Sequence, residues 1–471
     1  MKKSIALQGG SYSLIISAVV LALLIVANIF TSALPTTLTK YDISSTKLYS
    51  ITSNTKVVVN ALEKDVTIYW IVQADMEDDI IENLLGKYES LSKHIQVVKK
   101  NPDVYPTFAE QYTDEVVYNN SLIVECGERS RYISYDEIYV QETDMYSYSY
   151  TTSFDGEGAI TSAIDYVVSE DLPQMYVLEG HGEAELPATF SDQIEKENIE
   201  VTSFSLLTVD QVPEEADCVV IYAPASDISQ EEKELLAAYV TEGGKLLVMA
   251  GPTEEGTLTN LYSLLADYGV EASEGVVVEG DRNYYAFQMP YVLLPDMASS
   301  DITDALIEEK YNPILPIVQG LTVGSSAGNG TVTELLTTSE TAFSKIAGFG
   351  LSTYEKEEGD IDGPFTAAVS IETSNEGAIV WFASSDFLED MYNAYSSGAN
   401  VDMAMNAVSS LVGETEAIAI RSKSLNYNYL TINESAGSML KTLMIGVFPL
   451  CYLGLGICIH LRTRRKQNEA I

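Results

Sequence analysis

Basic residues are scarce in this sequence. Its 471 residues include 26 lysines and arginines against 69 aspartates and glutamates, which gives a formal net charge of −43 at pH 7. Proteins that bind nucleic acid neutralise the backbone phosphates with lysine and arginine, so this balance argues against nucleic acid as a partner. The simplest interpretation of the acidity is solubility.

Cysteine is also rare, with four residues in the whole chain. Cys451 and Cys458 lie in an apolar segment near the C-terminus, whereas Cys126 and Cys218 lie inside apolar runs that are typical of strands. A free cysteine in such a run usually acts as a small core hydrophobe. We therefore expect neither a disulfide nor redox chemistry.

The sequence lacks the usual motifs of hydrolytic enzymes. No G-x-S-x-G or G-x-C-x-G pattern occurs, although an α/β hydrolase carries its nucleophile in such a turn. The segment Thr241–Lys245 resembles a phosphate loop, but Tyr239 and Leu246 stand where that loop needs a glycine and a hydroxyl. A metal-dependent hydrolase would need more histidines or a tight carboxylate cluster. We expect no catalytic residues, no metal site and no cofactor.

One short loop stands out as a candidate ligand or partner loop. Gly180, His181, Gly182 and Glu183 follow a predicted strand, Met175–Leu178. Open α/β sheets bind ligands at the C-terminal ends of their strands, so this loop lies where a ligand or peptide would bind. A structural turn is the alternative interpretation of the same residues.

Two long apolar segments, Leu14–Phe30 and Leu443–Ile459, lie near the two ends of the chain. Each approaches the ~20 residues that a transmembrane helix needs. Lys2 and Lys3 precede the first segment and Arg462–Lys466 follow the second, which by the positive-inside rule places both termini in the cytoplasm. We predict two transmembrane helices in the cell membrane, with the bulk of the chain extracytoplasmic. A cleaved signal peptide is the alternative for the first segment.

Small residues in the second apolar segment suggest a helix contact. Gly446, Gly454 and Gly456 would let another helix approach closely, as small residues do in membrane helix pairs. Ordinary glycine enrichment in membrane helices is the alternative.

The region after the first apolar segment alternates between strand and helix patterns. Val66–Val72 and Ile95–Val98 are predicted strands on either side of a helix over Asp78–Ser92, and two further strands lie within 121–134. This order is that of a thioredoxin-like domain. The position of the redox C-x-x-C motif of such domains reads Gln73–Met76, which argues against oxidoreductase activity.

A second α/β region starts near residue 159. The near-continuous apolar run Cys218–Tyr222 is typical of a strand that is covered on both faces. A capping box, Ser229–Glu232, then begins a helix, and Lys245–Ala250 is the next strand. Strands that alternate with helices in this way predict a doubly wound parallel sheet.

Several motifs recur in an order that is typical of one family. They are Tyr41-Asp42-Ile43 with Leu48–Thr52, Gly180–Glu183, Val212–Asp217, Ser229–Ala250, Gly363-Pro364-Phe365 and Ser385–Leu388. In these motifs and in the flanking apolar segments the chain resembles the GldG family, the auxiliary subunits of gliding-motility-type ABC transport systems. The resemblance implies a non-catalytic partner of an ABC permease and its separate ATPase. It also implies a central domain like a class I glutamine amidotransferase sheet without the catalytic machinery.

The expected organisation combines these interpretations. It consists of a tail and first transmembrane helix (1–35), a thioredoxin-like domain (36–140), a linker (141–158), a doubly wound, glutamine-amidotransferase-like domain (159–415), a juxtamembrane linker (416–438), a second transmembrane helix (439–461) and a basic cytoplasmic tail (462–471). The expected function is an auxiliary subunit whose large acidic domain binds a substrate or partner. Two alternatives stay open: a tethered surface hydrolase that uses His181 and Glu183, and a structural cell-envelope protein.

Overall fold

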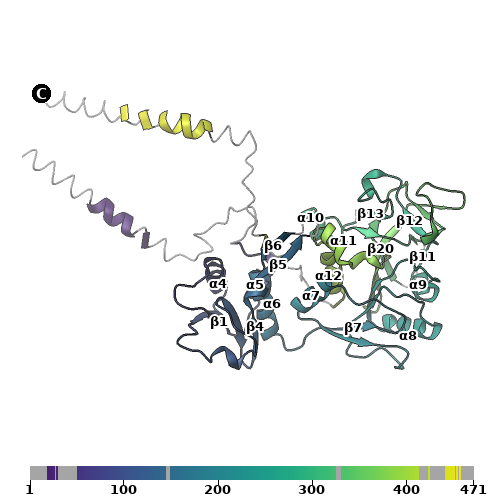
Figure 1. Ribbon diagram of the computed structural model, residues 1–471, viewed down its shortest axis with the longest axis horizontal. Coiled ribbons are helices and arrows are strands. Elements are labelled where there is room, and N and C mark those ends of the chain that lie inside the picture. Colours follow the sequence, from purple (N-terminus) through teal and green to yellow (C-terminus); the bar gives the residue numbers. More distant parts are fainter. Residues whose placement is uncertain are drawn as a thin grey trace, which may run out of the picture.

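The computed structural model describes a large part of the chain, in two units that each have a core of their own (Figure 1). The described residues are 18–26, 28–29, 50–144, 149–324, 330–412, 423–424, 441–450, 452–454 and 456–457. Both units combine helices with strands. The mixed α/β class that the sequence predicts therefore holds for the described residues.

The prediction of two transmembrane helices is contradicted. No helix among the described residues is both long and apolar enough to cross a membrane. The continuous helical runs described in the two apolar segments cover 18–26 and 441–450, and Thr442–Val447 within the second run is a π-helix. The fold class is corrected accordingly.

The N-terminal unit contains a four-stranded mixed sheet with the order β2-β1-β3-β4. Strand β1 is parallel to β2 and antiparallel to β3, and β3 forms a hairpin with β4. Helix α4 (Asp79–Leu91) connects β1 to β2, because parallel neighbours need a crossover. The strands are β1 Val66–Ile71, β2 Ile95–Lys100, β3 Ser121–Cys126 and β4 Arg129–Ile133.

Two further helices complete the core of this unit. Helix α3 (Ser53–Asn60) packs against α6 (Gly156–Val168), and α6 covers β3 and β4. The buried Ile160 and Ile164 of α6 belong to the same apolar cluster as Trp70 of β1. The core of the N-terminal unit therefore extends beyond residue 158, where the expected linker ends.

Regular structure also occupies part of the region that was expected to be a linker. Helix α5 (Tyr135–Ile138) leads into the antiparallel pair β5 (Tyr139–Asp144) and β6 (Ser149–Phe154). The short strand β22 (Lys423–Ser424) pairs with the end of β6. Phe154 is buried in the N-terminal core, so this hairpin is anchored to that unit.

The second unit is built on a large sheet with a parallel centre. Neighbouring strands run parallel in the order β8-β7-β9-β10-β21. Every residue of β9 is buried, as are most of those of β10, which explains their near-continuous apolar sequences. The parallel strands are β7 Gln174–Leu178, β8 Glu200–Phe204, β9 Cys218–Tyr222, β10 Lys245–Met249 and β21 Ala378–Phe382.

Beyond β21 the sheet continues with antiparallel strands. Strand β20 (Thr366–Thr373) is antiparallel to β21, because the connection 374–377 is too short for the crossover of a parallel pair. The sheet is therefore mixed, whereas the sequence predicts a parallel one. The other antiparallel strands are β11 Val270–Ala272, β14 Asp296–Met297, β16 Leu321–Val323 and β17 Gly330–Thr337.

Helices cover both faces of the parallel strands. Helix α12 (Ala399–Val412) packs on β9, β10 and β21, with α7 (Ala188–Lys196) beside it. Helix α8 (Gln230–Thr241) also packs on β10, with α9 (Thr259–Ala266) beside it. The remaining elements are α10 Asp304–Glu309, α11 Asp390–Tyr395, β12 Val276–Val278, β13 Val292–Leu293, β15 Leu315–Pro316, β18 Phe343–Lys345 and β19 Ile361–Asp362.

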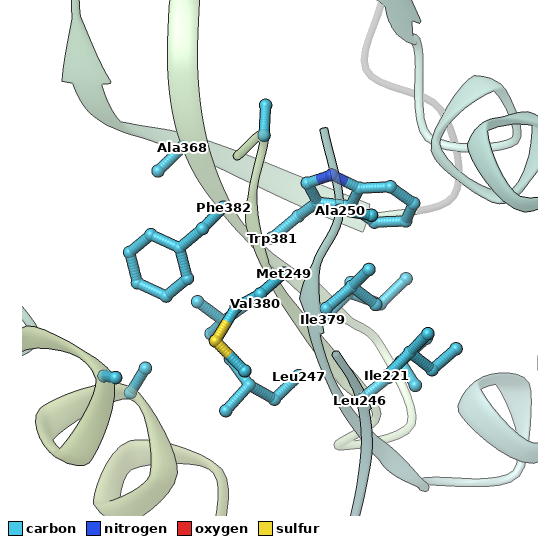
Figure 2. Packing of buried hydrophobic residues seen from close by; sticks show 14 of the residues in the cluster. Ile221, Leu246, Leu247, Met249, Ala250, Ala368, Ile379, Val380, Trp381 and Phe382 are labelled. Atoms are coloured by element: carbon cyan, nitrogen blue, oxygen red, sulfur yellow. The ribbon is translucent and has the colours of Figure 1, made fainter. Parts of the chain in front are cut away.

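The side chains of the central strands alternate between the two faces of the sheet (Figure 2). Met249 and Phe382 point to one side, where the Phe382 ring stacks on Phe387 with centroids 4.5 Å apart. Trp381 points to the other side and contacts Tyr262 of α9, with ring centroids 4.9 Å apart. The core of the second unit thus consists of two apolar layers with the sheet between them.

The two units contact each other through polar side chains. The Lys196 ammonium of α7 lies 2.5 Å from a carboxylate oxygen of Asp155, which precedes α6. The Asn198 amide donates to the carbonyl of Ser162 in α6 over 3.0 Å, and Arg131 of β4 donates to the Asn198 side chain. Polar contacts of this kind are typical of interfaces between separate domains.

Candidate functional site

The parallel sheet has a topological switch point between β7 and β9. From β7 the chain continues to β8 on one side, and from β8 it crosses to β9 on the other side of β7. Open α/β sheets bind ligands at such a point, beyond the C-terminal ends of the strands. The loop after β7 and the turn after β9 meet there, because the N–H groups of Ala225 and Ser226 donate to the His181 carbonyl over 3.1 and 2.9 Å.

Two carboxylates enclose the ring of His181 in this loop. Nδ1 lies 3.1 Å from Oε1 of Glu183, and Nε2 lies 3.1 Å from Oε2 of Glu232. The side chains are 7% exposed for His181 and 4% exposed for each glutamate. Each ring nitrogen has a carboxylate oxygen within hydrogen-bond distance. These three side chains form a buried polar cluster, named the His181 cluster below.

The glycines on either side of His181 shape the loop. Gly180 and Gly182 have φ angles of +133° and +73°, which side chains on an L-residue rarely permit. The tight turn brings the Glu183 carboxylate back to the N–H groups of Gly180 and His181, at 3.0 and 2.7 Å. The candidate residues Gly180, His181, Gly182 and Glu183 therefore lie together, in a loop closed on itself.

Glu232 is the member of the cluster that sequence reasoning interpreted only as a helix cap. Glu232 does belong to the capping box of α8, because its carboxylate accepts a 2.8 Å hydrogen bond from the N–H of the N-cap residue Ser229. The same oxygen also contacts His181. The sequence gives no further signal for this contact, because it depends on β7 and β9 being neighbours in the sheet.

The position directly after β9, where a hydrolase of this type carries its nucleophile, is occupied by alanine. Ala223, directly after β9, has a φ of +47°, a strained position of the kind that exposes the nucleophile of a hydrolase, but alanine has no reactive atom. Burial raises the pKa of the Cys218 thiol to about 12, and the described Cys126 and Cys218 are both free and buried. No group of three or more His, Cys, Asp or Glu side chains in the described part of the chain could hold a metal ion.

Carboxylates on the same edge of the sheet define its electrostatics. Burial raises the pKa of Asp386, and burial together with Asp386 and Asp390 raises the pKa of Glu389. The pKa of Tyr222 at the end of β9 is raised by burial and by these same carboxylates. This edge therefore disfavours an anionic ligand.

The three glycines singled out as packing residues lie in the second apolar segment. Among the described residues, and apart from its own helix, a Cβ added at Gly446, Gly454 or Gly456 would meet no atom within 4 Å. Their role in contacting another helix stays a prediction.

The stability of the His181 cluster should depend on pH through Glu232. Burial raises the pKa of Glu232, but hydrogen bonds from Ser229 and the neighbouring His181 lower it by more, so the net shift is downward. The folded state thus favours the ionised Glu232. The stability that this ionised carboxylate contributes is fully present above pH 4.5, the ordinary pKa, and is lost as the pH falls through the lowered pKa of the folded state. We expect the loss of stability in Glu232→Gln, measured by urea unfolding, to shrink below about pH 4.5. The exposed neighbour is the control: Glu231→Gln should show a small difference at every pH, and equal behaviour of the two variants would contradict the assignment.

Comparison with known proteins identifies one informative family. Residues 172–291 match the family described as ABC-type uncharacterized transport system. The matched region includes His181, Glu183 and Glu232, and it supports a broad assignment to the auxiliary proteins of ABC transport systems. The narrower resemblance to the GldG family is not confirmed by this match.

Residues 45–141 match a domain of unknown function (DUF7088), and no curated protein matches the chain.

Solved structures with similar folds are distant. The N-terminal domain of mmIFT52 has a TM-score of 0.40 at 16% identity, and the match covers 52% of this chain and 100% of that domain. A glutamine amidotransferase from Thermotoga maritima has a TM-score of 0.30 at 9% identity, covering 52% and 100%. A ThuA-like protein from Parabacteroides merdae has a TM-score of 0.28 at 11% identity, covering 54% and 98%. Similarity at this level supports no inference about function.

Proposed function

We propose that this chain is a non-catalytic auxiliary subunit of an ABC-type transport system and acts by binding other proteins. The family match over residues 172–291 carries the proposal. That region contains four of the five parallel strands and the complete His181 cluster. The partners in this proposal are an ABC permease and its separate ATPase, and the acidic second unit binds a substrate or a partner.

The chemistry of the switch point supports a role without catalysis. Both ring nitrogens of His181 already contact carboxylates, so neither is free to act as a base toward a substrate. The strained position after β9 is occupied by Ala223. The hydrolase alternative needs a nucleophile that this arrangement does not supply, and a binding or structural role needs none.

Purification of the complex tests this function. We expect the full chain, affinity-tagged and purified from its own cells after mild detergent treatment, to bring down one permease and one ABC-type ATPase in a constant ratio, as quantified by mass spectrometry. A tagged unrelated acidic protein is the control. Recovery without either component would contradict the proposal and favour a structural cell-envelope role. The extracytoplasmic location stays a prediction, which labelling of intact cells with a membrane-impermeant lysine reagent would check.

A further inference from the structure

A groove of about 660 Å³ lies where the two units meet. The N-terminal unit lines it with Arg131 and Tyr132 of β4 and with Tyr166 of α6. The second unit contributes Ile194 of α7 and Val201 of β8. Apolar atoms make up most of the lining surface, and Ser191, Glu195 and Glu200 are among its polar residues. Residues of both units therefore form one continuous surface.

The strands on the two sides of this groove are both edges of their sheets. Strand β4 pairs only with β3, and β8 pairs only with β7, among the residues that the structure describes. An edge strand has backbone donors and acceptors on its free side, and these groups are a template for pairing with another chain.

The hydrogen bonds of β8 determine which of its residues face outward. Glu200 donates its N–H to the Pro173 carbonyl over 2.9 Å, and the Phe204 carbonyl accepts the N–H of Glu179 over 2.8 Å. The backbone groups of residues 200 and 204 therefore point toward β7. In a parallel pair the direction alternates along the strand, so those of Val201 and Ser203 point away from the sheet. Both residues are exposed, and Val201 is 46% exposed.

An extended polypeptide is the ligand whose chemistry fits this edge. Its backbone offers donors and acceptors at the same spacing as β8, and its alternate side chains reach one face. Arg131 contacts Asn198 and lies over the Tyr166 ring at 5.8 Å, and a guanidinium with five N–H groups retains donors for an acceptor side chain of the ligand. A second copy of this chain fits poorly, because each copy has a net charge of −43.

We propose that the groove between β4 and β8 binds an extended segment of a partner protein, which adds to β8 as a further strand. The segment is mainly apolar and carries one acceptor side chain opposite Arg131. This inference goes beyond the role as a transport subunit, because it specifies where and by what contacts a partner binds. It does not require that the partner be a permease.

Peptides selected on the full chain from a phage library of random twelve-residue sequences test this surface. A synthetic copy of a selected peptide is then titrated by fluorescence anisotropy. Ser203→Pro removes an outward N–H that β7 does not use, and proline is tolerated on such an edge. We expect about tenfold weaker binding for Ser203→Pro and for Val201→Pro, since one backbone hydrogen bond is lost. Ser203→Ala keeps that N–H and should bind like the wild type.

Hydrogen exchange provides a readout that does not depend on how well a proline variant folds. In the wild-type chain the peptide should slow exchange at the amides of Val201 and Ser203. Protection elsewhere only, or wild-type affinity in a folded Ser203→Pro variant, would overturn the proposal. Failure to select any peptide that protects these amides would overturn it too. A dimer that protects them without peptide would replace the partner by a second copy.

Discussion

Replacing His181 with alanine is expected to lower the free energy of unfolding by about 3–5 kcal/mol, the usual cost when the removal of one partner leaves a buried charge uncompensated. The substitution leaves Glu183 and Glu232, each with a side chain only 4% exposed, without the imidazole between them. Their charges are 3.1 Å from the ring nitrogens in the folded protein, so both lose their closest favourable contact. Urea unfolding at neutral pH, followed by circular dichroism, measures the loss.

The other described histidine that contacts a carboxylate provides a matched control. Nδ1 of His94 lies 2.8 Å from Asp65, but the Asp65 side chain is 91% exposed. Water screens such a pair, and His94→Ala should cost no more than about 1 kcal/mol. A loss for His181→Ala as small as that for His94→Ala would contradict a stabilising role of the buried His181 cluster.

A combined substitution separates the loss of the ring from the stranded carboxylates. Glu183→Gln and Glu232→Gln in the His181→Ala background remove the unpaired charges, and part of the lost stability should return. No recovery would mean that the cost comes from packing of the ring, and that the carboxylates carry little of it.

The sequence predicts the local parts of the site but not their assembly. His181 and Glu183 are two residues apart between glycines after an apolar strand, so a loop at the end of that strand follows from the pattern alone. Glu232 joins them because β9, and not β8, is the neighbour of β7 on that side. Strand order of this kind depends on packing across the whole sheet, which periodicity within one segment does not contain.

Predictions of the fold have the same limit. The alternation of apolar residues predicts β1, α4 and β9 well, because each depends on its own sequence. The antiparallel extension through β20 depends on the short connection 374–377 and on strands from an irregular stretch of sequence. Hydropathy alone predicted two membrane spans, whereas no described helix is both long and apolar enough to cross a membrane.

The second large effect is expected at Trp381. The chain has two tryptophans, Trp70 and Trp381, and each is almost completely buried in a different core cluster. Trp381 fills the layer between β21 and α9, where it contacts Tyr262. Trp381→Ala removes this side chain from a packed core and should lower the free energy of unfolding of the second unit by about 3–5 kcal/mol. Circular dichroism in urea measures this change.

Fluorescence of the remaining Trp70 then shows whether the destabilisation stays within the second unit. Trp381→Phe retains an aromatic ring in that core and serves as the reference, because Trp70 is the sole tryptophan in both variants. The units meet through polar contacts such as Lys196 with Asp155, which couple domains weakly. The Trp70 transition should therefore have the same midpoint in Trp381→Ala and Trp381→Phe. A Trp70 midpoint that falls with the circular dichroism transition would mean that the two cores unfold as one cooperative unit.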